Sequence, residues 1–321
     1  MTQLAFADSV NLAQSPTPNG QQTIVGQTTV VRDVVTTLLA GGHCLIEGVP
    51  GLGKTLLART LTQLLGGEYK RIQFTADLMP ADVAGHTMFD FQSQTFNIRR
   101  GPVFCNFLLA DEINRAPAKT QSALLEAMQE QHVTIDGQTH NLPQPFMVLA
   151  TQNPIEQDGT YPLPQAQMDR FLSKIQILYP TKDEEVELVK LIAGGMKTNI
   201  DVSAVHAIMN PEQLRALQAT VASLPCDAEV ADYIVRIVRA TREHTAIDTG
   251  AGPRASLSLL QASRAHALMS GHEFVTPDDV KHVAHMVLRH RLRLSAEFEI
   301  EGKQIDDVIT ELLAQIEAPR Q

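Results

Sequence analysis

The chain of 321 residues has no tryptophan, only 5% aromatic residues and only three cysteines. Because aromatic rings are the usual stacking surfaces for single-stranded nucleic acids, their scarcity disfavours that class of ligand. The cysteines, Cys44, Cys105 and Cys226, are isolated, odd in number and set among apolar neighbours. This usage is typical of small buried side chains in a reducing compartment.

Basic residues and long apolar runs are scarce as well. Lys and Arg total 26 against 36 Asp and Glu, which gives a formal net charge of −10 and a pI of about 5.5. This balance argues against a dominant non-specific nucleic-acid mode, which would show as a basic patch or stripe. No apolar run approaches the roughly 20 residues of a membrane span, and the N-terminus lacks signal-peptide features. We therefore expect no membrane span and a cytoplasmic location.

The order of predicted elements divides the chain into an arm and two domains. Residues 1–22 are polar and contain several proline, asparagine and glycine residues, which predicts a flexible N-terminal arm. Residues 23–180 alternate predicted strands with helices, which predicts an α/β fold whose parallel sheet is covered on both faces. Helical periodicity dominates residues 181–321, which predicts an all-helical second domain.

Apolar runs and apolar residues at helical spacing locate the individual elements. In the first domain we expect helices at 28–40, 55–65 and 120–131, strands at 44–46, 69–74, 103–110, 146–150 and 174–178, and a hairpin at 133–142. In the second domain we expect helices at 183–193, 211–222, 227–243, 254–270, 277–291 and 305–316. Asn210-Pro211 and Thr276-Pro277 each place a capping side chain before a proline suited to the first helical position.

The most specific motif is Gly48-Val49-Pro50-Gly51-Leu52-Gly53-Lys54-Thr55, a full match to the P-loop pattern. Its glycines let backbone N–H groups point at phosphate oxygens, and the following helix presents its positive end to them. Lys54 would contact the β- and γ-phosphates, and the Thr55 hydroxyl would bind Mg²⁺. We therefore predict an ATP site whose nucleotide-binding residues include Gly48, Pro50, Gly51, Leu52, Gly53, Lys54, Thr55 and Leu56.

Two other apolar strands end in polar residues that suit the same site. The run 103–110 leads to Asp111-Glu112, where Asp111 would hold Mg²⁺, partly through water, and Glu112 would polarise the attacking water as general base. The run 146–150 leads to Asn153, whose amide is suited to hold that water or the γ-phosphate. Alone, these patterns would be an ordinary helix cap and an ordinary Asn-Pro turn. Beside a P-loop they predict hydrolysis of ATP.

Together these residues resemble the AAA+ superfamily of P-loop NTPases and, more narrowly, the MoxR family, from Ile24 to about Leu294. The most specific segments are Ala110 to Met128, Ala150 to Pro154 and Gly159 to Phe171. The resemblance implies a three-layer core at 23–180 and an all-helical lid domain at 181–321. It also implies an insert within the second helix at 74–100 and a hairpin before sensor 1 at 133–142, and in a ring both would face the pore or a partner. The alternative for both is surface decoration.

The resemblance also implies roles that spacing alone does not. Val25-Gly26-Gln27 resembles the segment that packs near the adenine, Asn153 matches sensor 1, and Arg254 matches sensor 2 at the start of a lid helix. Arg170 matches the arginine finger that reaches the nucleotide of the next subunit. A surface ion pair is the alternative for either arginine. Because such a finger neutralises charge in the transition state, activity would depend on assembly of a ring, which we expect to be hexameric. The expected catalytic residues are thus Lys54, Glu112, Asn153, Arg170 and Arg254.

The function implied by the resemblance is Mg-dependent ATP hydrolysis that remodels, assembles or activates a protein client. MoxR relatives commonly act with von Willebrand factor A domain proteins, often around metal or cofactor insertion. Three alternatives stay open. A magnesium-chelatase-like motor subunit would co-purify with a porphyrin-binding subunit. A nucleic-acid motor, disfavoured by the acidic balance, would show salt-sensitive stimulation by DNA. A switch would bind ATP tightly with negligible turnover.

Overall fold

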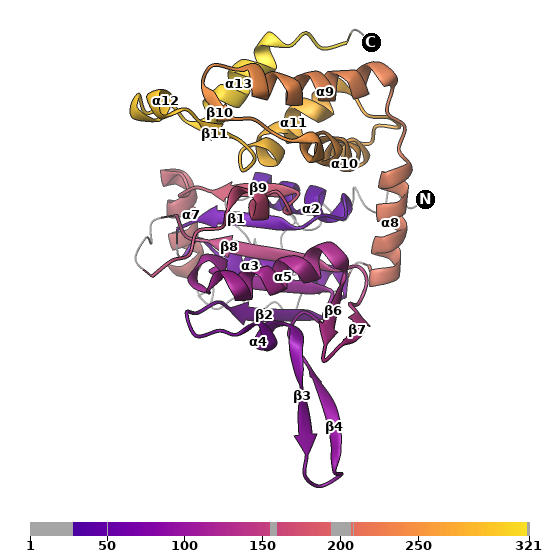
Figure 1. Ribbon diagram of the computed structural model, residues 1–321. Coiled ribbons are helices and arrows are strands. Elements are labelled where there is room, and N and C mark those ends of the chain that lie inside the picture. Colours follow the sequence, from indigo (N-terminus) through magenta and orange to yellow (C-terminus); the bar gives the residue numbers. More distant parts are fainter. Residues whose placement is uncertain (1–27, 50, 155–158, 194–206, 208, 320–321) are drawn as a thin grey trace.

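The computed structural model describes residues 28–49, 51–154, 159–193, 207 and 209–319, which form an α/β layer with a helical layer stacked on it (Figure 1). The expected arm at 1–22, the adenine-side segment Val25-Gly26-Gln27 and Pro50 lie outside the described residues. Within the described ranges, every helix is too short or too polar to cross a lipid bilayer.

Five parallel strands form the central sheet in the order β2-β5-β8-β1-β9. Their bounds are β1 (Cys44–Gly48), β2 (Tyr69–Gln73), β5 (Phe107–Asp111), β8 (Met147–Gln152) and β9 (Ser173–Ile177). The helices that cover the sheet are α2 (Thr28–Leu39), α3 (Lys54–Leu65) and α5 (Ala118–Glu130). Because all five strands run the same way, their carboxyl ends meet at one edge. The predicted α/β class with a parallel sheet is confirmed.

Side chains of each strand point alternately to the two faces of the sheet. Ile46 and Leu109 belong to the buried cluster formed with α2 and α3, whereas Leu45 and Leu108 belong to the cluster formed with α5. Every residue of β5 is buried. Burial on both faces is the reason that this strand has an apolar sequence without alternation.

The strand β5 begins later than its apolar sequence predicts. We expected one strand over 103–110, but residues 103–106 form turns and bends and the strand starts at Phe107. The Asn106 side chain accepts a hydrogen bond from the Glu68 backbone N–H and donates one to the Pro145 carbonyl, both at 3.0 Å. These contacts anchor the turn, because a buried amide needs partners that a continuous strand would not supply.

Two hairpins extend from the α/β layer. The segment 74–100 contains the short helix α4 (Pro80–Ala84) and a ribbon of β3 (Gly85–Asp90) and β4 (Thr95–Arg100) that projects away from the body (Figure 1). The second hairpin pairs β6 (His132–Ile135) with β7 (Gln138–Asn141). Its turn residues Asp136 and Gly137 have φ values of 48° and 80°, as the two-residue turn requires. The predicted hairpin is confirmed.

Helices dominate after Pro180, as expected. They are α7 (Lys182–Ala193), α8 (Pro211–Ser223), α9 (Ala228–Glu243), α10 (Pro253–Met269), α11 (Pro277–Leu288), α12 (Ala296–Ile300) and α13 (Ile305–Gln315). Both predicted caps form: Asn210 accepts from the Gln213 N–H and Thr276 from the Asp279 N–H. One short antiparallel pair, β10 (Ile247–Thr249) with β11 (Arg293–Leu294), accompanies the helices. The sequence did not predict these two strands, because a strand of two or three residues is too short to show a periodic pattern of apolar residues.

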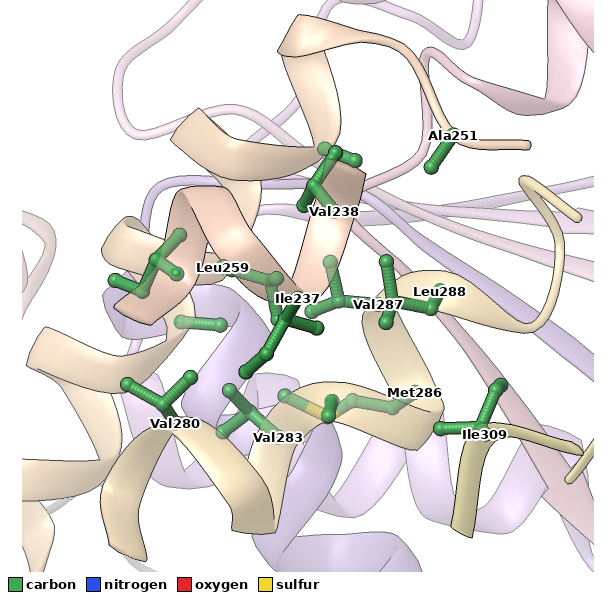
Figure 2. Close-up of a cluster of buried hydrophobic side chains, with 14 of the residues drawn as sticks. Ile237, Val238, Ala251, Leu259, Val280, Val283, Met286, Val287, Leu288 and Ile309 are labelled. Carbon is green, nitrogen blue, oxygen red and sulfur yellow. The ribbon is translucent and has the colours of Figure 1, made fainter. Parts of the chain in front are cut away.

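The helical layer has a core of its own (Figure 2). Ile237 of α9, Leu259 of α10 and Val283 of α11 meet there, each fully buried. The helix α8 belongs elsewhere, since its Leu217 packs in the cluster formed by α2, α3 and the sheet. The helices after residue 180 therefore contribute to two cores, and the expected boundary at residue 180 stays a prediction.

Candidate nucleotide site

Three polar segments leave the same edge of the sheet. The strand β1 leads into the P-loop, β5 ends at Asp111 and continues to Glu112, and β8 leads to Asn153. Because β8 lies between β1 and β5, Asn153 follows the strand that separates the P-loop from the two acids. Ligands of open parallel sheets bind beyond the carboxyl ends of the strands. The topology therefore brings the predicted P-loop, acids and asparagine to one edge.

The described part of the P-loop has the backbone that its glycines predict. Gly51 and Gly53 have φ values of 88° and 76°, in the left-handed region that other residues rarely adopt. The helix α3 begins directly afterwards at Lys54, so its unpaired N–H groups face the loop. The Lys54 Nζ donates to the Gly48 carbonyl at 2.7 Å, which places the ammonium group inside the turn. A positive helix end and a lysine thus converge there.

Both carboxylate oxygens of Asp111 have partners. The Thr151 hydroxyl donates to Oδ1 at 2.5 Å, and Arg71 Nη2 lies 2.6 Å from Oδ2. The same Thr151 hydroxyl accepts the Glu112 backbone N–H at 2.8 Å. Thr151 therefore ties the end of β8 to the end of β5 and fixes the orientation of the carboxylate.

Glu112 leaves the strand in an unusual backbone conformation, with φ 56° and ψ 51°. A non-glycine residue in this region is uncommon, and such conformations cluster at functional sites. Its Oε2 accepts from Gln73 Nε2 at 2.8 Å and lies 2.9 Å from Arg115 Nε. The Glu112 carboxylate is therefore held between the neighbouring strand β2 and the short 3-10 turn at Ile113–Arg115.

Arg71 and Gln73 were not among the residues that we expected at the site. Both lie on β2, the parallel neighbour of β5, and the register pairs Gln73 with Asp111. Two polar residues flank the buried Ile72 in this edge strand, and this alternation was the available signal. It could not be interpreted without the strand order, because sequence alone does not say which strand lies beside β5.

The donor chemistry at this edge fits a magnesium–phosphate ligand. Mg²⁺ prefers oxygen ligands, and the Thr55 hydroxyl in the first turn of α3 and the Asp111 carboxylate are of that kind. Since Thr151 and Arg71 already contact the two oxygens of Asp111, this carboxylate suits a contact through water. The phosphates would meet Lys54 and the N-terminus of α3.

The two predicted arginines lie near the segment that follows α6 (Gln165–Met168). Arg170 lines a surface hollow of about 190 Å³ together with Glu126 and Glu130 of α5, and no P-loop residue lines it. Arg254, in the first turn of α10, is 49% exposed, and its Nη1 lies 4.0 Å from Asp169 Oδ2. Asp169 therefore directly precedes one predicted arginine in the chain and lies near the other in space.

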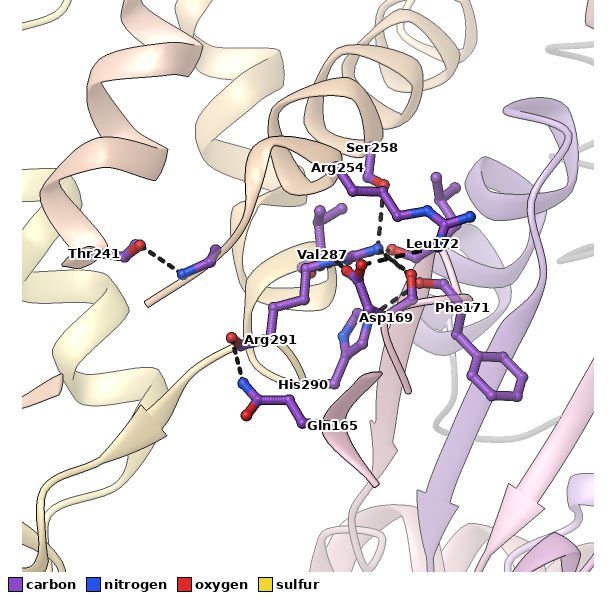
Figure 3. A network of polar contacts seen from close by, with 11 residues as sticks. Gln165, Asp169, Phe171, Leu172, Thr241, Arg254, Ser258, Val287, His290 and Arg291 are labelled. Atoms are coloured by element: carbon purple, nitrogen blue, oxygen red, sulfur yellow. Dashed lines mark hydrogen bonds and ion pairs between the residues drawn. The ribbon is translucent and has the colours of Figure 1, made fainter. Parts of the chain in front are cut away.

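A third arginine, Arg291, also contacts Asp169 and was not predicted from the sequence (Figure 3). We call the group formed by Asp169, Arg254 and Arg291 the lid junction. Arg291 follows α11, is 2% exposed and places its Nε 2.7 Å from Asp169 Oδ1. Burial lowers the pKa of Arg291, and the hydrogen bond that it donates to Asp169 opposes this effect. The sequence held no signal for it, because an arginine near the end of an expected helix at 277–291 is ordinarily a surface residue.

Comparison with known proteins identifies the family. Residues 43–173 match the ATPase family associated with various cellular activities (AAA), and residues 239–312 match the AAA lid domain. Chaperone MoxR1 of Mycobacterium tuberculosis is 44% identical over 306 residues, which span 92% of this chain and 80% of that protein. YeaC of Bacillus subtilis is 42% identical over 298 residues, 93% of this chain and 92% of that protein. A crystal structure from Cytophaga hutchinsonii has a TM-score of 0.88 and 36% identity, covering 99% of this chain and 96% of that one. The chain therefore belongs to the MoxR family of AAA+ ATPases and is an ATP-hydrolysing enzyme.

Proposed function

We propose that a hexameric ring of this chain hydrolyses Mg-ATP in the cytoplasm and uses the energy to remodel, assemble or activate a protein client. The observation that carries the proposal is the meeting of the P-loop, Asp111-Glu112 and Asn153 at one edge of the sheet. Membership of the AAA+ family supports oligomeric assembly.

Binding in this scheme is electrostatic. Lys54 and the N-terminus of α3 bind the β- and γ-phosphates, while Thr55 and, through water, Asp111 hold the magnesium ion. When bound, the ion neutralises charge that develops on the phosphates. The ordered Asp111 carboxylate supports this role, because the hydrogen bond from Thr151 fixes its orientation.

Hydrolysis requires a base and a group that orients the water. Glu112 accepts the proton of the attacking water, and Asn153 holds that water or the γ-phosphate. Glu112 Oε2 accepts from Gln73 and contacts Arg115, so the attacking water reaches the carboxylate at Oε1 or replaces one of these two partners.

The site is completed from outside the subunit. Arg170 supplies the arginine finger to the nucleotide of the next subunit, and Arg254 of the lid contacts the nucleotide of its own subunit as sensor 2. The hollow at Arg170 is formed by α5 rather than by the P-loop, which supports an action on a neighbouring nucleotide. The exposure of Arg254 leaves its guanidinium accessible to a ligand.

The client role is that of a MoxR-type chaperone, acting with a von Willebrand factor A domain protein and often in metal or cofactor insertion. The printed name of the mycobacterial relative, Chaperone MoxR1, supports this role. The β3–β4 ribbon supports a protein as the client, since Phe91 and Phe96 at its tip are 86% and 73% exposed beside Phe89. Exposed apolar patches of this kind mark protein-binding surfaces.

The substitution Glu112→Gln tests the proposal. We expect ATP affinity to be retained and turnover to fall at least about 100-fold, because the amide cannot accept the proton. The exposed Glu229→Gln on α9 is the matched control and should turn over ATP normally. Unimpaired hydrolysis by Glu112→Gln would remove its assigned role.

The same variant, held in its ATP state, tests the client. Affinity purification followed by mass spectrometry should return a protein with a von Willebrand factor A domain. A porphyrin-binding subunit in its place would support a chelatase-like motor. Turnover that DNA stimulates, with an effect that salt weakens steeply, would support a nucleic-acid motor.

A further inference from the structure

Arg291 binds the segment that carries Arg170 at several points. Besides the contact with the Asp169 carboxylate, its Nη2 donates to the Phe171 carbonyl at 2.8 Å and its Nη1 to the Leu172 carbonyl at 3.1 Å. Its own carbonyl accepts from Gln165 Nε2 of α6 at 2.8 Å. The residues on both sides of Arg170 are therefore attached to one arginine.

The same guanidinium is attached to the lid. Its Nη2 donates to the Ser258 hydroxyl at 3.2 Å, and its Nη1 donates to the Val287 carbonyl of α11. Ser258 lies one turn after Arg254 on α10, so the contact joins the finger segment to the helix that carries sensor 2 (Figure 3). Arg291 thus bridges α10, α11 and the segment 169–172.

All donors of this side chain are in use. An arginine has five N–H donors in a rigid fork, and here they reach six acceptors: the Asp169 carboxylate, four backbone carbonyls and one hydroxyl. The side chain is 2% exposed, so water does not compete for these donors. A buried, fully paired guanidinium is a stiff connection, which a lysine with its single nitrogen cannot reproduce.

We propose that Arg291 is a positioning residue for ATP hydrolysis, which couples the arginine finger that a subunit offers its neighbour to the position of its own lid. The proposal rests on the proposed role of Arg170. Asp169 contributes the second link, since Arg291 contacts one of its carboxylate oxygens and Arg254 lies 4.0 Å from the other. A lid movement driven by the nucleotide of one subunit therefore moves Arg170 relative to the nucleotide of the next.

Rings assembled from two kinds of subunit allow the arginine finger and the nucleotide site that it reaches to be altered separately. We call the subunit that offers Arg170 the donor and the neighbouring subunit that hydrolyses ATP the acceptor. Donor subunits carry Glu112→Gln, so they turn over no ATP but still offer a finger to wild-type acceptors. Donors with Glu112→Gln alone set the reference turnover per acceptor. Donors that also carry Arg170→Ala test the finger, and donors that also carry Arg291→Lys test the inference. Arg293→Lys is the matched control, because Arg293 is 64% exposed and pairs with Asp248 of the neighbouring strand β10.

We expect Arg291→Lys donors to lower acceptor turnover about tenfold, while the donors' own affinity for Mg-ATP, measured with a fluorescent analogue, changes less than twofold. Combining Arg291→Lys with Arg170→Ala should lower turnover no further than Arg170→Ala alone, because both changes remove the same contribution, that of the arginine finger to hydrolysis in the acceptor. Arg293→Lys donors should match the reference. A structural role alone would not move the turnover of a neighbouring, unaltered subunit.

Two outcomes separate failure of the inference from failure of the proposed function. If Arg170→Ala donors leave acceptor turnover unchanged, Arg170 is not the finger and the inference falls with it. If Arg170→Ala lowers turnover and Arg291→Lys does not, the inference alone is overturned. Should Arg291→Lys prevent folding or ring assembly, Asp169→Asn donors replace it, since that carboxylate is 31% exposed. Reference turnover with Asp169→Asn would equally overturn the inference.

Discussion

Two arginine–aspartate pairs in this molecule have nearly equal nitrogen–oxygen distances, but the arginine of one pair is exposed and that of the other is buried. Arg71 lies 2.6 Å from Asp111 at the edge of the sheet and is 46% exposed, whereas Arg291 lies 2.7 Å from Asp169 at the lid junction and is 2% exposed. Exposed pairs contribute little because water and salt replace them, while removing one partner of a buried pair is costly. Pairs with similar distances can therefore differ in role. Arg71 can release Asp111 to a ligand, whereas Arg291 stabilises the folded chain.

Removing the buried arginine should have the largest effect. We expect Arg291→Met to lower the free energy of unfolding by about 3 kcal/mol, the low end for a buried pair because Asp169 is partly exposed. Much of the loss comes from backbone carbonyls left without a donor. Urea unfolding measures it. A loss of stability as small as that of Arg71→Met would show that the two pairs do not differ.

Changing the aspartate at the sheet edge should affect catalysis rather than folding. We expect Asp111→Asn to lower Mg-dependent turnover about 100-fold, because the amide carries no charge for the ion. The free energy of unfolding should fall by no more than about 1 kcal/mol, since Arg71 is 46% exposed and water can replace the aspartate as its partner. Steady-state kinetics and urea unfolding of the same preparation provide the two numbers. Normal turnover would contradict the metal role.

The junction should also respond to pH. Burial lowers the pKa of His290 well below 6.5, and its Nε2 donates to the Phe171 carbonyl at 3.0 Å. Above pH 6.5 the ring is neutral in both the folded and the unfolded state. Below it the unfolded chain takes up a proton that the folded chain refuses, so stability falls with falling pH. Between pH 7.5 and 5.5 this residue should account for a loss of about 1.4 kcal/mol.

The variant His290→Gln isolates that contribution, because glutamine keeps a donor for the Phe171 carbonyl but does not titrate. The stability difference between pH 7.5 and 5.5, measured by urea unfolding, should shrink by about 1.4 kcal/mol relative to the native chain. An unchanged difference would show that protonation of the junction histidine does not matter.

The smallest effect concerns the exposed arginine. We expect Arg71→Met to lower the Mg²⁺ concentration for half-maximal turnover about twofold, because an exposed pair contributes about 0.5 kcal/mol and the substitution removes the competitor for Asp111. Raising the salt concentration should reduce the difference between the two proteins. A higher requirement for Mg²⁺ would indicate that Arg71 helps to build the metal site instead of competing for it.

Much of the site could be predicted because it consists of short motifs at the ends of apolar strands. The P-loop, Asp111-Glu112 and Asn153 each lie within a few residues of a strand, so once the sheet is parallel they must share an edge. The partners of these residues could not be predicted. Arg71 and Gln73 act across strands whose neighbourhood depends on the strand order, and Asn106 delays β5 through contacts with Glu68 and Pro145.

By itself the sequence determined the nucleotide motif, the alternation of strands and helices, and helix starts such as Asn210 and Thr276. All of these depend on residues close together in the chain, where backbone preferences and hydrogen bonds act locally. Only the tertiary structure decided that Arg291 would be buried and would hold Asp169, 122 residues away. Burial and long-range pairing follow from how distant segments pack, and a single arginine looks the same in the sequence whether it ends in water or in the lid junction.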